Sequence, residues 1–453
     1  MKLLFRIIFL ILSVMMSFSD QGFCETLSLS QAVENAVKHN PGLQAAQFNT
    51  LLSEEKIIQA RSGFMPQVQL TGQYNYTNNP MWAFGTKLNQ ESITQEDFDP
   101  AQLNNPDGIG NFISTVSVSL PLYDRGQTLY RWQQARLNHE SAVFLADNTR
   151  HQVIARTITA YIGALLAREN LKVVKQTLKT ARTHLKMVES RYKGGFVVKS
   201  DLLRAQVHIA EIEQQLTDAL SQIDIAGCML NVAMGMSGNI SGEYFKYVLT
   251  TPLKKGRKIT GSLDSWISRA MSNRPDLKHM KYQKTIAEKE LEKSRAARYP
   301  SVSLSGRYEL NSEDLLDQAA NYTVGAMVSI NLFSGGRISA KIRESHAALN
   351  QVNAALQAMK QQICGETRQA FFNTQSAWKR IGVAQAAVGQ AEESLRIVRN
   401  RYNSGLFTIT DLLDAEVMVQ QSRTNHLKAV HDFRAAETRL ALASGTIDEK
   451  LYQ

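Results

Sequence analysis

Two regular patterns of hydrophobic residues divide this chain, one with a period of seven residues and one with a period of two. The seven-residue pattern runs through two proline-free stretches of roughly 65 residues, each about 95 Å long as a single helix. A sustained seven-residue apolar repeat predicts left-handed coiled-coil packing of long helices. The stripe comprises Leu171, Leu178, Leu185 and Tyr192 in the first stretch, and Ile342, Leu349, Leu356, Ile363, Ala370, Ala377, Ala384, Ala391 and Val398 in the second.

The two-residue pattern marks four short segments. In the first, "QVQLTGQYNY", the apolar Val68, Leu70 and Tyr74 point to one side and the intervening polar residues to the other. This alternation predicts strands of a sheet with one apolar and one polar face. About ten alternating residues also cross an outer membrane, so a membrane sheet and a half-buried soluble sheet both remain open. The four segments are residues 67–76, 114–123, 301–310 and 323–332.

The chain contains an internal repeat. "RYKGGFVVKSDLLRAQV" at residues 191–207 and "RYNSGLFTITDLLDAEV" at 401–417 are identical at eight of seventeen positions and lie 210 residues apart. Near the start of each half, "SLSQAVENAVKHNPGL" at 28–43 aligns with "SLDSWISRAMSNRPDL" at 262–277.

We therefore divide the mature chain into two structural repeats, residues 25–261 and 262–453. Each repeat is expected to contain short helices, two strands and a long helical hairpin. The first repeat has 24 extra residues between Tyr76 and Phe112, which we interpret as a long hairpin loop between its strands.

Local signals predict where the helices begin. Ser30 and Asp264 are the expected N-caps of the first short helix in each repeat. Each short helix should end before a proline, and Pro41 and Pro275 then suit the first turn of the next helix.

The repeated motif is predicted to be the turn of each helical hairpin. Gly195 and Gly405 supply positions where a positive φ carries little cost. Serine or threonine followed by aspartate then caps the returning helix and places a carboxylate at its positive end. The capping residues expected are Ser200, Asp201, Thr410 and Asp411.

The first 24 residues have the layout of a secretory signal peptide. Lys2 and Arg6 precede an apolar run that is too short to span a membrane, and small and polar residues follow. Cleavage after Cys24, cleavage after Ser19 and lipidation of Cys24 all remain open.

Charge, cysteine count and the absence of known motifs exclude several classes of function. The formal net charge is +10, but the basic residues are spread along the chain, which favours a solvated helical surface over a nucleic-acid site. Cys228 and Cys364 form no disulfide framework. No catalytic constellation, phosphate loop or zinc spacing is present, so we expect no enzyme, no metal and no cofactor.

Four strands cannot close a barrel, and an open sheet edge in lipid leaves backbone groups unpaired. If the strands lie in a membrane, several chains must therefore associate. Together with the two turn motifs, "LSLSQAVENAVKHNPGL" near the N-terminus and "LPLYDRGQ" and "NLFSGGR" at the strand-to-helix junctions resemble the TolC-type outer-membrane efflux and secretion channels. The resemblance covers essentially the whole mature chain.

The resemblance implies an α+β membrane protein that forms a homotrimer. Each chain would give four strands to a 12-stranded β-barrel in the outer-membrane lipid and its helical hairpins to a long periplasmic α-helical barrel. It implies a passive exit duct of a tripartite efflux or type I secretion system. The implied partners are a periplasmic adaptor (membrane fusion) protein and an inner-membrane transporter, with no nucleic acid.

The resemblance also implies roles for residues at the turns. Asp411 and Asp414 match the acidic pair whose symmetry copies ring the tunnel entrance, and Tyr402 matches a tyrosine of the closed-state network. These three are the predicted periplasmic gate, while Phe407 stands where the family's network uses an arginine. The predicted adaptor-docking residues are Arg191, Gly195, Phe196, Arg401, Gly405 and Leu406.

Charge distinguishes the two turns. Three-fold symmetry would gather the carboxylates of Asp411 and Asp414 around one axis, where they would attract cations and raise one another's pKa. In the first turn we expect Arg204 to offset Asp201. Helix capping explains Asp411 equally well, but not Asp414.

Other classes of function remain open at this point. A secreted or periplasmic coiled-coil scaffold without a pore would leave the alternating strands unexplained. An outer-membrane enzyme or adhesin would need a catalytic constellation or a large passenger domain. Drugs, metals and polypeptides all remain open as cargo, because in such a system the transporter selects it.

Overall fold

The computed structural model describes residues 26–236 and 247–448. The expected signal peptide at residues 1–24, with Cys24, lies outside the described residues. The chain forms two compact units. Of the described residues, the first unit contains 26–47, 144–236, 247–277 and 358–448, and the second contains 48–143 and 278–357.

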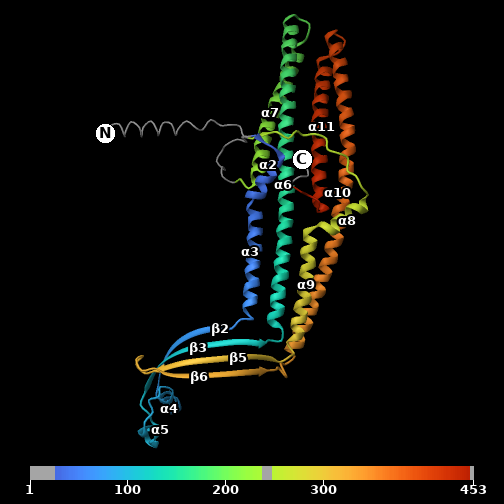
Figure 1. Cartoon of the computed structure of the whole chain (residues 1–453). Helices are drawn as coiled ribbons and strands as arrows, with labels where there is room; N and C mark the ends of the chain where they lie inside the picture. Colours follow the sequence, from blue (N-terminus) through green and yellow to red (C-terminus); the bar gives the residue numbers. More distant parts are fainter. Residues whose placement is uncertain (1–25, 237–246, 449–453) are drawn as a thin grey trace, which may run out of the picture. The chain divides into compact units, whose positions relative to one another are not determined.

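The second unit contains a four-stranded antiparallel sheet with the order β2-β3-β5-β6 (Figure 1). All four predicted strands are confirmed. The first and third predicted segments match β2 and β5 closely, whereas β3 begins earlier than predicted, at Ile109, and β6 both begins and ends earlier, at Ala319 and Ser329. The strands are β2 (Gln67–Thr77), β3 (Ile109–Tyr123), β5 (Ser301–Ser312) and β6 (Ala319–Ser329).

Register aligns the apolar residues of all four strands in rows across one face. One row is Leu70, Val116, Tyr308 and Tyr322. The adjacent row, which points to the opposite face, is Gln69, Ser117, Arg307 and Thr323. The apolar row is not covered, since Leu70 is 73% and Tyr322 is 81% exposed. The sheet therefore has an open apolar face and a polar face, as the alternation predicted.

The 24-residue insertion is not a simple loop. It folds into α4 (Pro80–Asn89), the 3₁₀ helix η1 (Gln95–Phe98) and α5 (Pro100–Asn104). The side chains of Asn79 and Asp99 cap the two α-helices, each just before a proline at the first helical position. The hydrogen-bonded Asn-Pro and Asp-Pro starts are the local reason that the segment is helical.

Two short helices begin the repeats, α2 (Leu29–His39) and α8 (Leu263–Asn273). The expected N-caps Ser30 and Asp264 are wrong, because Ser28 and Ser262 are the caps and accept hydrogen bonds from the third helical residue. Ser30 and Asp264 instead lie in the first turn. The prediction that Pro41 and Pro275 lie in the first turn of the next helix is confirmed, since they begin α3 (Pro41–Ser62) and α9 (Pro275–Ala296).

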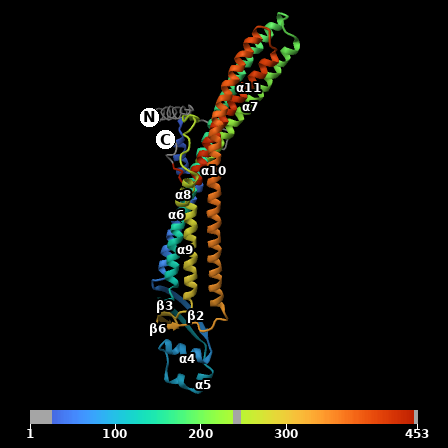
Figure 2. The same cartoon turned by 90° about the vertical axis from the view of Figure 1, so that its right-hand side faces the viewer.

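The first unit is built from helical hairpins. The predicted long helices are confirmed as α6 (Gln127–Lys193) and α10 (Arg337–Asn403), each 67 residues long, and each contributes to both units. They turn back as α7 (Lys199–Met234) and α11 (Ile409–Ala443). In this unit the four helices run side by side toward the two turns (Figures 1 and 2).

A buried tyrosine organises the other end of the first unit. Tyr161 of α6 is fully buried, and its hydroxyl donates to the carbonyl oxygen of Leu27 at 2.8 Å. Leu27 lies in a parallel two-stranded ladder, β1 (Thr26–Leu27) with β4 (Val248–Leu249). This ladder joins the start of the first repeat to the segment that follows its hairpin. Within residues 26–236 and 247–448, no helix combines the length and the apolar character needed to cross a membrane.

Candidate functional site

The two turn motifs have the same backbone geometry. Gly195 has a φ of +75° and Gly405 a φ of +78°, so the predicted left-handed positions are confirmed. The N–H of Phe196 donates to the carbonyl oxygen of Arg191, and that of Leu406 to Arg401, both at 2.9 Å. With the bonds from the glycine N–H groups, these form Schellman motifs that end the outgoing helices.

The caps of the returning helices differ from the prediction. In the second turn the N-cap is Thr408, and Asp411 is the third helical residue of a capping box with it. The N–H of Thr408 donates to Asp411 Oδ2 at 2.8 Å and its hydroxyl at 2.7 Å. In the first turn the N-cap is Val198, which has no side-chain cap. The predicted caps Ser200 and Thr410 are instead the second residues of helices α7 and α11.

The capping box fixes the charge state of Asp411. The hydrogen bond from the Thr408 hydroxyl, followed by that from its N–H, holds the pKa of Asp411 below its ordinary value of 3.8. Its contribution to stability is therefore present above pH 3.8 and is lost as the pH falls through the lowered pKa. Within one chain this shift is opposite to the rise expected in a ring of carboxylates, which would require several copies.

The two hairpins share a hydrophobic core near their turns. Its buried members come from all four helices, so each turn is supported by the other hairpin. Among them is Tyr402, which is 3% exposed and belongs to the core rather than to the surface. The buried members are Val188, Ala205, Tyr402, Ile409 and Leu412.

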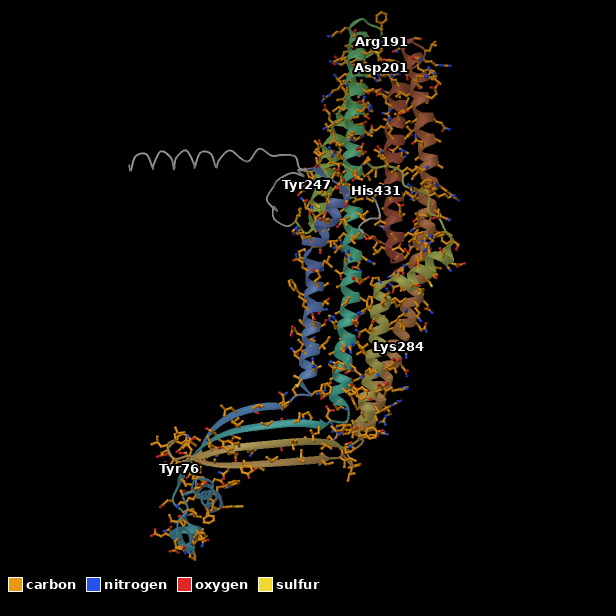
Figure 3. The ribbon with its side chains drawn as sticks, viewed as in Figure 1. Tyr76, Arg191, Asp201, Tyr247, Lys284 and His431 are labelled. Carbon is orange, nitrogen blue, oxygen red and sulfur yellow. The ribbon has the colours of Figure 1, made fainter. Side chains whose placement is uncertain are left out.

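Arg191 connects the two turns, and Figure 3 shows it at the end of the first hairpin. Its guanidinium carbon lies 4.7 Å from the ring centre of Tyr402 in the other hairpin. It also donates hydrogen bonds to the carbonyl oxygens of Tyr402, at 3.3 Å, and Asn403, at 3.4 Å. The repeat counterpart Arg401 instead stacks on Phe407 of its own turn, at 5.4 Å. Only the first arginine therefore links the hairpins in this way.

Arg204 makes a second link between the turns. It was expected to offset Asp201, which Figure 3 shows near the same turn, but it donates instead to the hydroxyl of Thr410 at 2.7 Å. Thr410 lies on the second returning helix, next to Asp411. Asp411 and Asp414 are both exposed. Sequence reasoning missed this contact because it joins residues of different repeats.

The turns also present apolar side chains to solvent. Phe196 is 82% exposed and Leu406 is 71% exposed, and Val198 is exposed as well. The ring of Phe196 lies against Gly194, but most of its surface, like that of Leu406, faces solvent. These residues therefore form an exposed apolar surface at the tips of the two hairpins.

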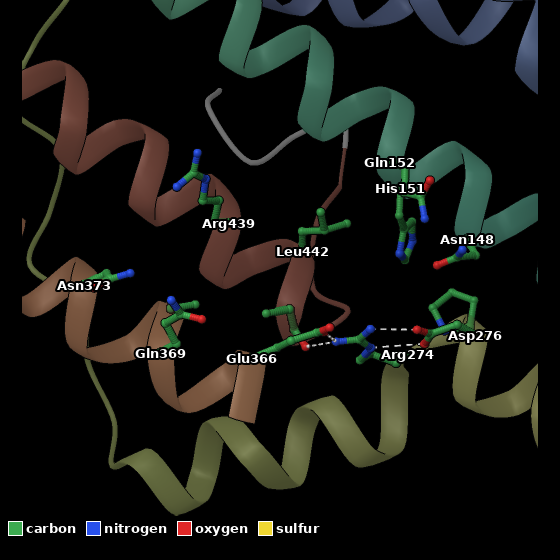
Figure 4. A pocket seen from close by; sticks show the side chains of 13 residues that line it. Asn148, His151, Gln152, Arg274, Asp276, Glu366, Gln369, Asn373, Arg439 and Leu442 are labelled. Carbon is green, nitrogen blue, oxygen red and sulfur yellow. Dashed lines mark hydrogen bonds and ion pairs between the residues drawn. The ribbon is translucent and has the colours of Figure 1, made fainter. Parts of the chain in front are cut away.

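A polar cavity of about 430 Å³ also lies in the first unit (Figure 4). Arg274 donates to Glu366 Oε2 and to Asp276 Oδ2, both at 2.6 Å. Burial opposes the charge of Asp276, but the hydrogen bonds from Arg274 outweigh burial and lower its pKa. Arg274 thus ties the junction of α8 and α9 to α10. The cavity contains a structural ion-pair clamp, with no nucleophile paired to a base.

The described residues contain no group of three or more histidine, cysteine, aspartate or glutamate side chains arranged to hold a metal ion. Cys228 and Cys364 are both free.

Comparison with known proteins agrees with this architecture. The model of the family described as outer membrane efflux protein matches residues 32–236 and 266–446. The chain is 23% identical over 433 residues to the alkaline protease secretion protein AprF of Pseudomonas aeruginosa, covering 93% of this chain and 85% of the relative. It is 25% identical over 445 residues to the proteases secretion protein PrtF of Dickeya chrysanthemi, covering 97% and 92%.

Solved structures show the same fold. A crystal structure of a membrane protein from Pseudomonas aeruginosa is similar to this chain with a TM-score of 0.78 and 17% sequence identity. The match covers 92% of each chain. The sheet, the long helices and their hairpins thus recur together over nearly the whole length.

Proposed function

This chain belongs to the outer membrane efflux protein family, and from that premise we propose that it works as a homotrimeric exit duct with a gated periplasmic mouth. As a member of the family it is an outer-membrane channel of an efflux or type I secretion system, with its helical tunnel in the periplasm. The finer proposals concern assembly, partners, the residues at the turns and the cargo.

The observation that carries the assembly is the open, two-sided sheet. Its outer strands β2 and β6 each pair on one side only, and its apolar face is exposed. Unpaired strand edges and an apolar surface are tolerated together when copies of the chain complete a barrel in lipid. Three copies with four strands each give twelve strands, with the polar face toward the lumen.

The turns are proposed to serve two partners. Phe196 and Leu406, with the turns formed around Gly195 and Gly405, support docking of a periplasmic adaptor that links the duct to an inner-membrane transporter. Arg191 and Arg401 were predicted to share this role, but Arg191 is already engaged by Tyr402. We therefore assign Arg191 to the contact between hairpins.

The gate is proposed at the second turn, where Asp411 and Asp414 are exposed and Tyr402 is held beneath Arg191. In a trimer the two carboxylates of each copy would form the acidic ring. Arg204, bonded to Thr410, brings a positive charge from the first hairpin to the same region and adjusts the ring's potential.

The cargo is proposed to be a polypeptide. Two relatives that match over more than nine-tenths of this chain are named for secretion of proteases. This supports a partnership with a protein-exporting transporter. Loss of the chain in its host should then remove specific proteins from the culture medium. A mutant with a normal set of secreted proteins but increased drug sensitivity would favour drug efflux instead.

A pair of neighbouring substitutions tests the barrel. Leu70→Arg places a charge on the apolar face, which costs about 2–4 kcal/mol at the midplane of an outer membrane. Gln69→Arg places the same charge on the polar face. We expect Leu70→Arg to reduce the amount of membrane-inserted trimer, measured by crosslinking and mass photometry in detergent, while Gln69→Arg assembles normally. Equal losses, or a stable soluble monomer of the unaltered chain, would contradict the proposal.

A further inference from the structure

A cluster of ionisable side chains is buried between the two helical hairpins, beyond the contacts described at the turns. His184 comes from α6, His208 from α7 and Glu416 from α11. Each histidine is 8% exposed and the glutamate 4%. The first hairpin therefore supplies two imidazoles and the second supplies one carboxylate.

The contacts within the cluster join the hairpins. His184 Nδ1 contacts Glu416 Oε1, and His208 Nε2 lies 4.0 Å from Glu416 Oε2. Beyond these two contacts, neither oxygen of Glu416 accepts a hydrogen bond from another group in the described part of the chain. A buried carboxylate without hydrogen bonds is strongly unfavourable unless a positive charge lies beside it. The stability of this contact thus depends on the charge of the imidazoles.

Few other charges face the cluster. On α7, Glu211 Oε2 lies 3.8 Å from His208 Nδ1, but its side chain is largely exposed. Arg182 of α6, two residues before His184, is paired with Glu213 of α7 at 2.8 Å. From α10, leucine, valine and tyrosine side chains enter the adjoining core, and no ion pair joins α10 to the cluster within the described residues. Glu416 therefore depends on the two histidines.

The internal repeat does not explain the cluster. At an offset of 210, the equivalent positions are occupied by neutral side chains, and Gln206, the counterpart of Glu416, is exposed. The chain thus carries titratable groups at one of two equivalent places, where α11 packs on the first hairpin. The pairs of equivalent residues are His184 and Ser394, His208 and Met418, and Glu416 and Gln206.

We propose that His184, His208 and Glu416 form a proton-dependent latch, which holds the second hairpin on the first when the imidazoles are protonated and releases it when they are neutral. The proposal rests on the channel function given above, since release would loosen the periplasmic mouth. Histidine is in general the side chain that gains or loses a proton in the physiological pH range. Because the groups are buried, salt screens their attraction weakly.

The test is the conductance of the full-length trimer in planar bilayers. We expect the open probability of the unaltered protein to be about tenfold higher at pH 8 than at pH 5. Glu416→Gln introduces the residue present at the equivalent position 206 and should remove most of this change. His184→Ser combined with His208→Met, again the residues of the other repeat, should do the same. His346→Gln removes an exposed histidine of the second unit and should leave the change intact.

The outcomes separate the latch from the channel. Unaltered protein that conducts at no pH would contradict the channel function, whereas a conducting protein whose pH response survives Glu416→Gln overturns the latch alone. A response that disappears at about 1 M salt would assign it to exposed carboxylates and overturn the latch. If Glu416→Gln does not assemble, the variant with His184→Ser and His208→Met provides the test, and a pH response that survives in it overturns the latch. Block by Zn²⁺ that depends on Glu416, without any pH response, would make the cluster a metal site and overturn the latch.

Discussion

Replacing Arg191 with alanine tests whether the two turns hold each other closed. The substitution removes the only stacking contact on Tyr402 that comes from the other hairpin among the described residues, together with two hydrogen bonds to backbone carbonyls. We expect the mouth formed by the turns to open more readily, because these contacts between the two hairpins are lost.

The structure sets the size of the effect. A guanidinium over an aromatic ring contributes about 0.5–1 kcal/mol at exposed sites and about 2 kcal/mol when desolvated. Arg191 is half-buried and both hydrogen bonds exceed 3.2 Å, so the lower part of the usual range of about 1.5–3 kcal/mol for charged donors applies to them together. The loss is then about 2 kcal/mol, which corresponds to roughly a thirtyfold shift toward the open state.

Single-channel recording of the trimer measures this shift as open probability. Arg401→Ala is the matched control, since Arg401 occupies the equivalent position but stacks within its own turn. It should change the open probability by no more than about fivefold, in line with one exposed cation–π contact of at most about 1 kcal/mol. The open probability of Arg191→Lys should lie between those of the unaltered protein and Arg191→Ala, because lysine keeps the charge but lacks the planar guanidinium group. If Arg401→Ala opened the channel as much as Arg191→Ala, the contact between hairpins would not be the cause.

Three further predictions concern the gate, the cysteines and the insertion. Asp411→Asn with Asp414→Asn should reduce cation selectivity and weaken block by multivalent cations in bilayers, and a larger effect of Asp201→Asn would assign the gate to the first hairpin. Thiol titration of the unfolded mature protein should find both Cys228 and Cys364 free, with the exposed Cys228 reacting faster in the folded state; a count of zero would contradict this part of the structure. A tag inserted after Asn104, clear of the Lys87–Asp97 ion pair, should be labelled on intact cells, because the helices leave the sheet on the periplasmic side. Labelling only after rupture of the outer membrane would reverse this topology.

Periodicity predicted most of the fold. The seven-residue stripe found the two long helices, and the two-residue alternation found all four strands, because each pattern follows from the geometry of a single element. Helix starts were less predictable. Ser28 and Ser30 are both good capping residues, and only the reciprocal bonds with Gln31 select the first.

The insertion shows how local signals can be overlooked. Its two α-helices begin at Asn79-Pro80 and Asp99-Pro100, which are recognisable starts in the sequence. The segment has no counterpart in the second repeat, so comparison of the repeats alone indicates only a long loop. Lys87 Nζ lies 2.5 Å from Asp97 Oδ1, and this hydrogen bond lowers the pKa of Asp97 to about 2. The insertion is therefore a folded element on the sheet.

The candidate site was only partly predictable. The glycines were found because positive φ is a local requirement, and Phe196 and Leu406 because they flank those glycines. The contacts between the two hairpins were not predicted from the sequence. Arg191 with Tyr402, and Arg204 with Thr410, join residues more than 200 positions apart, and no periodicity within one helix specifies such a pair.

Comparison of the two repeats distinguishes residues needed for the backbone of each turn from residues that make contacts between the hairpins. Gly195 and Gly405 are the same residue because both turns need the same backbone geometry. Arg204 and Asp414 differ, as do Gln206 and Glu416, and the members that differ are the ones in contact with the opposite hairpin or exposed at the mouth. If both repeats carried the same charges, every contact between neighbouring hairpins would respond alike. Because they differ, the proposed response to pH would act on the contact that contains Glu416 and not on the equivalent place in the other repeat, where Gln206 is neutral and exposed.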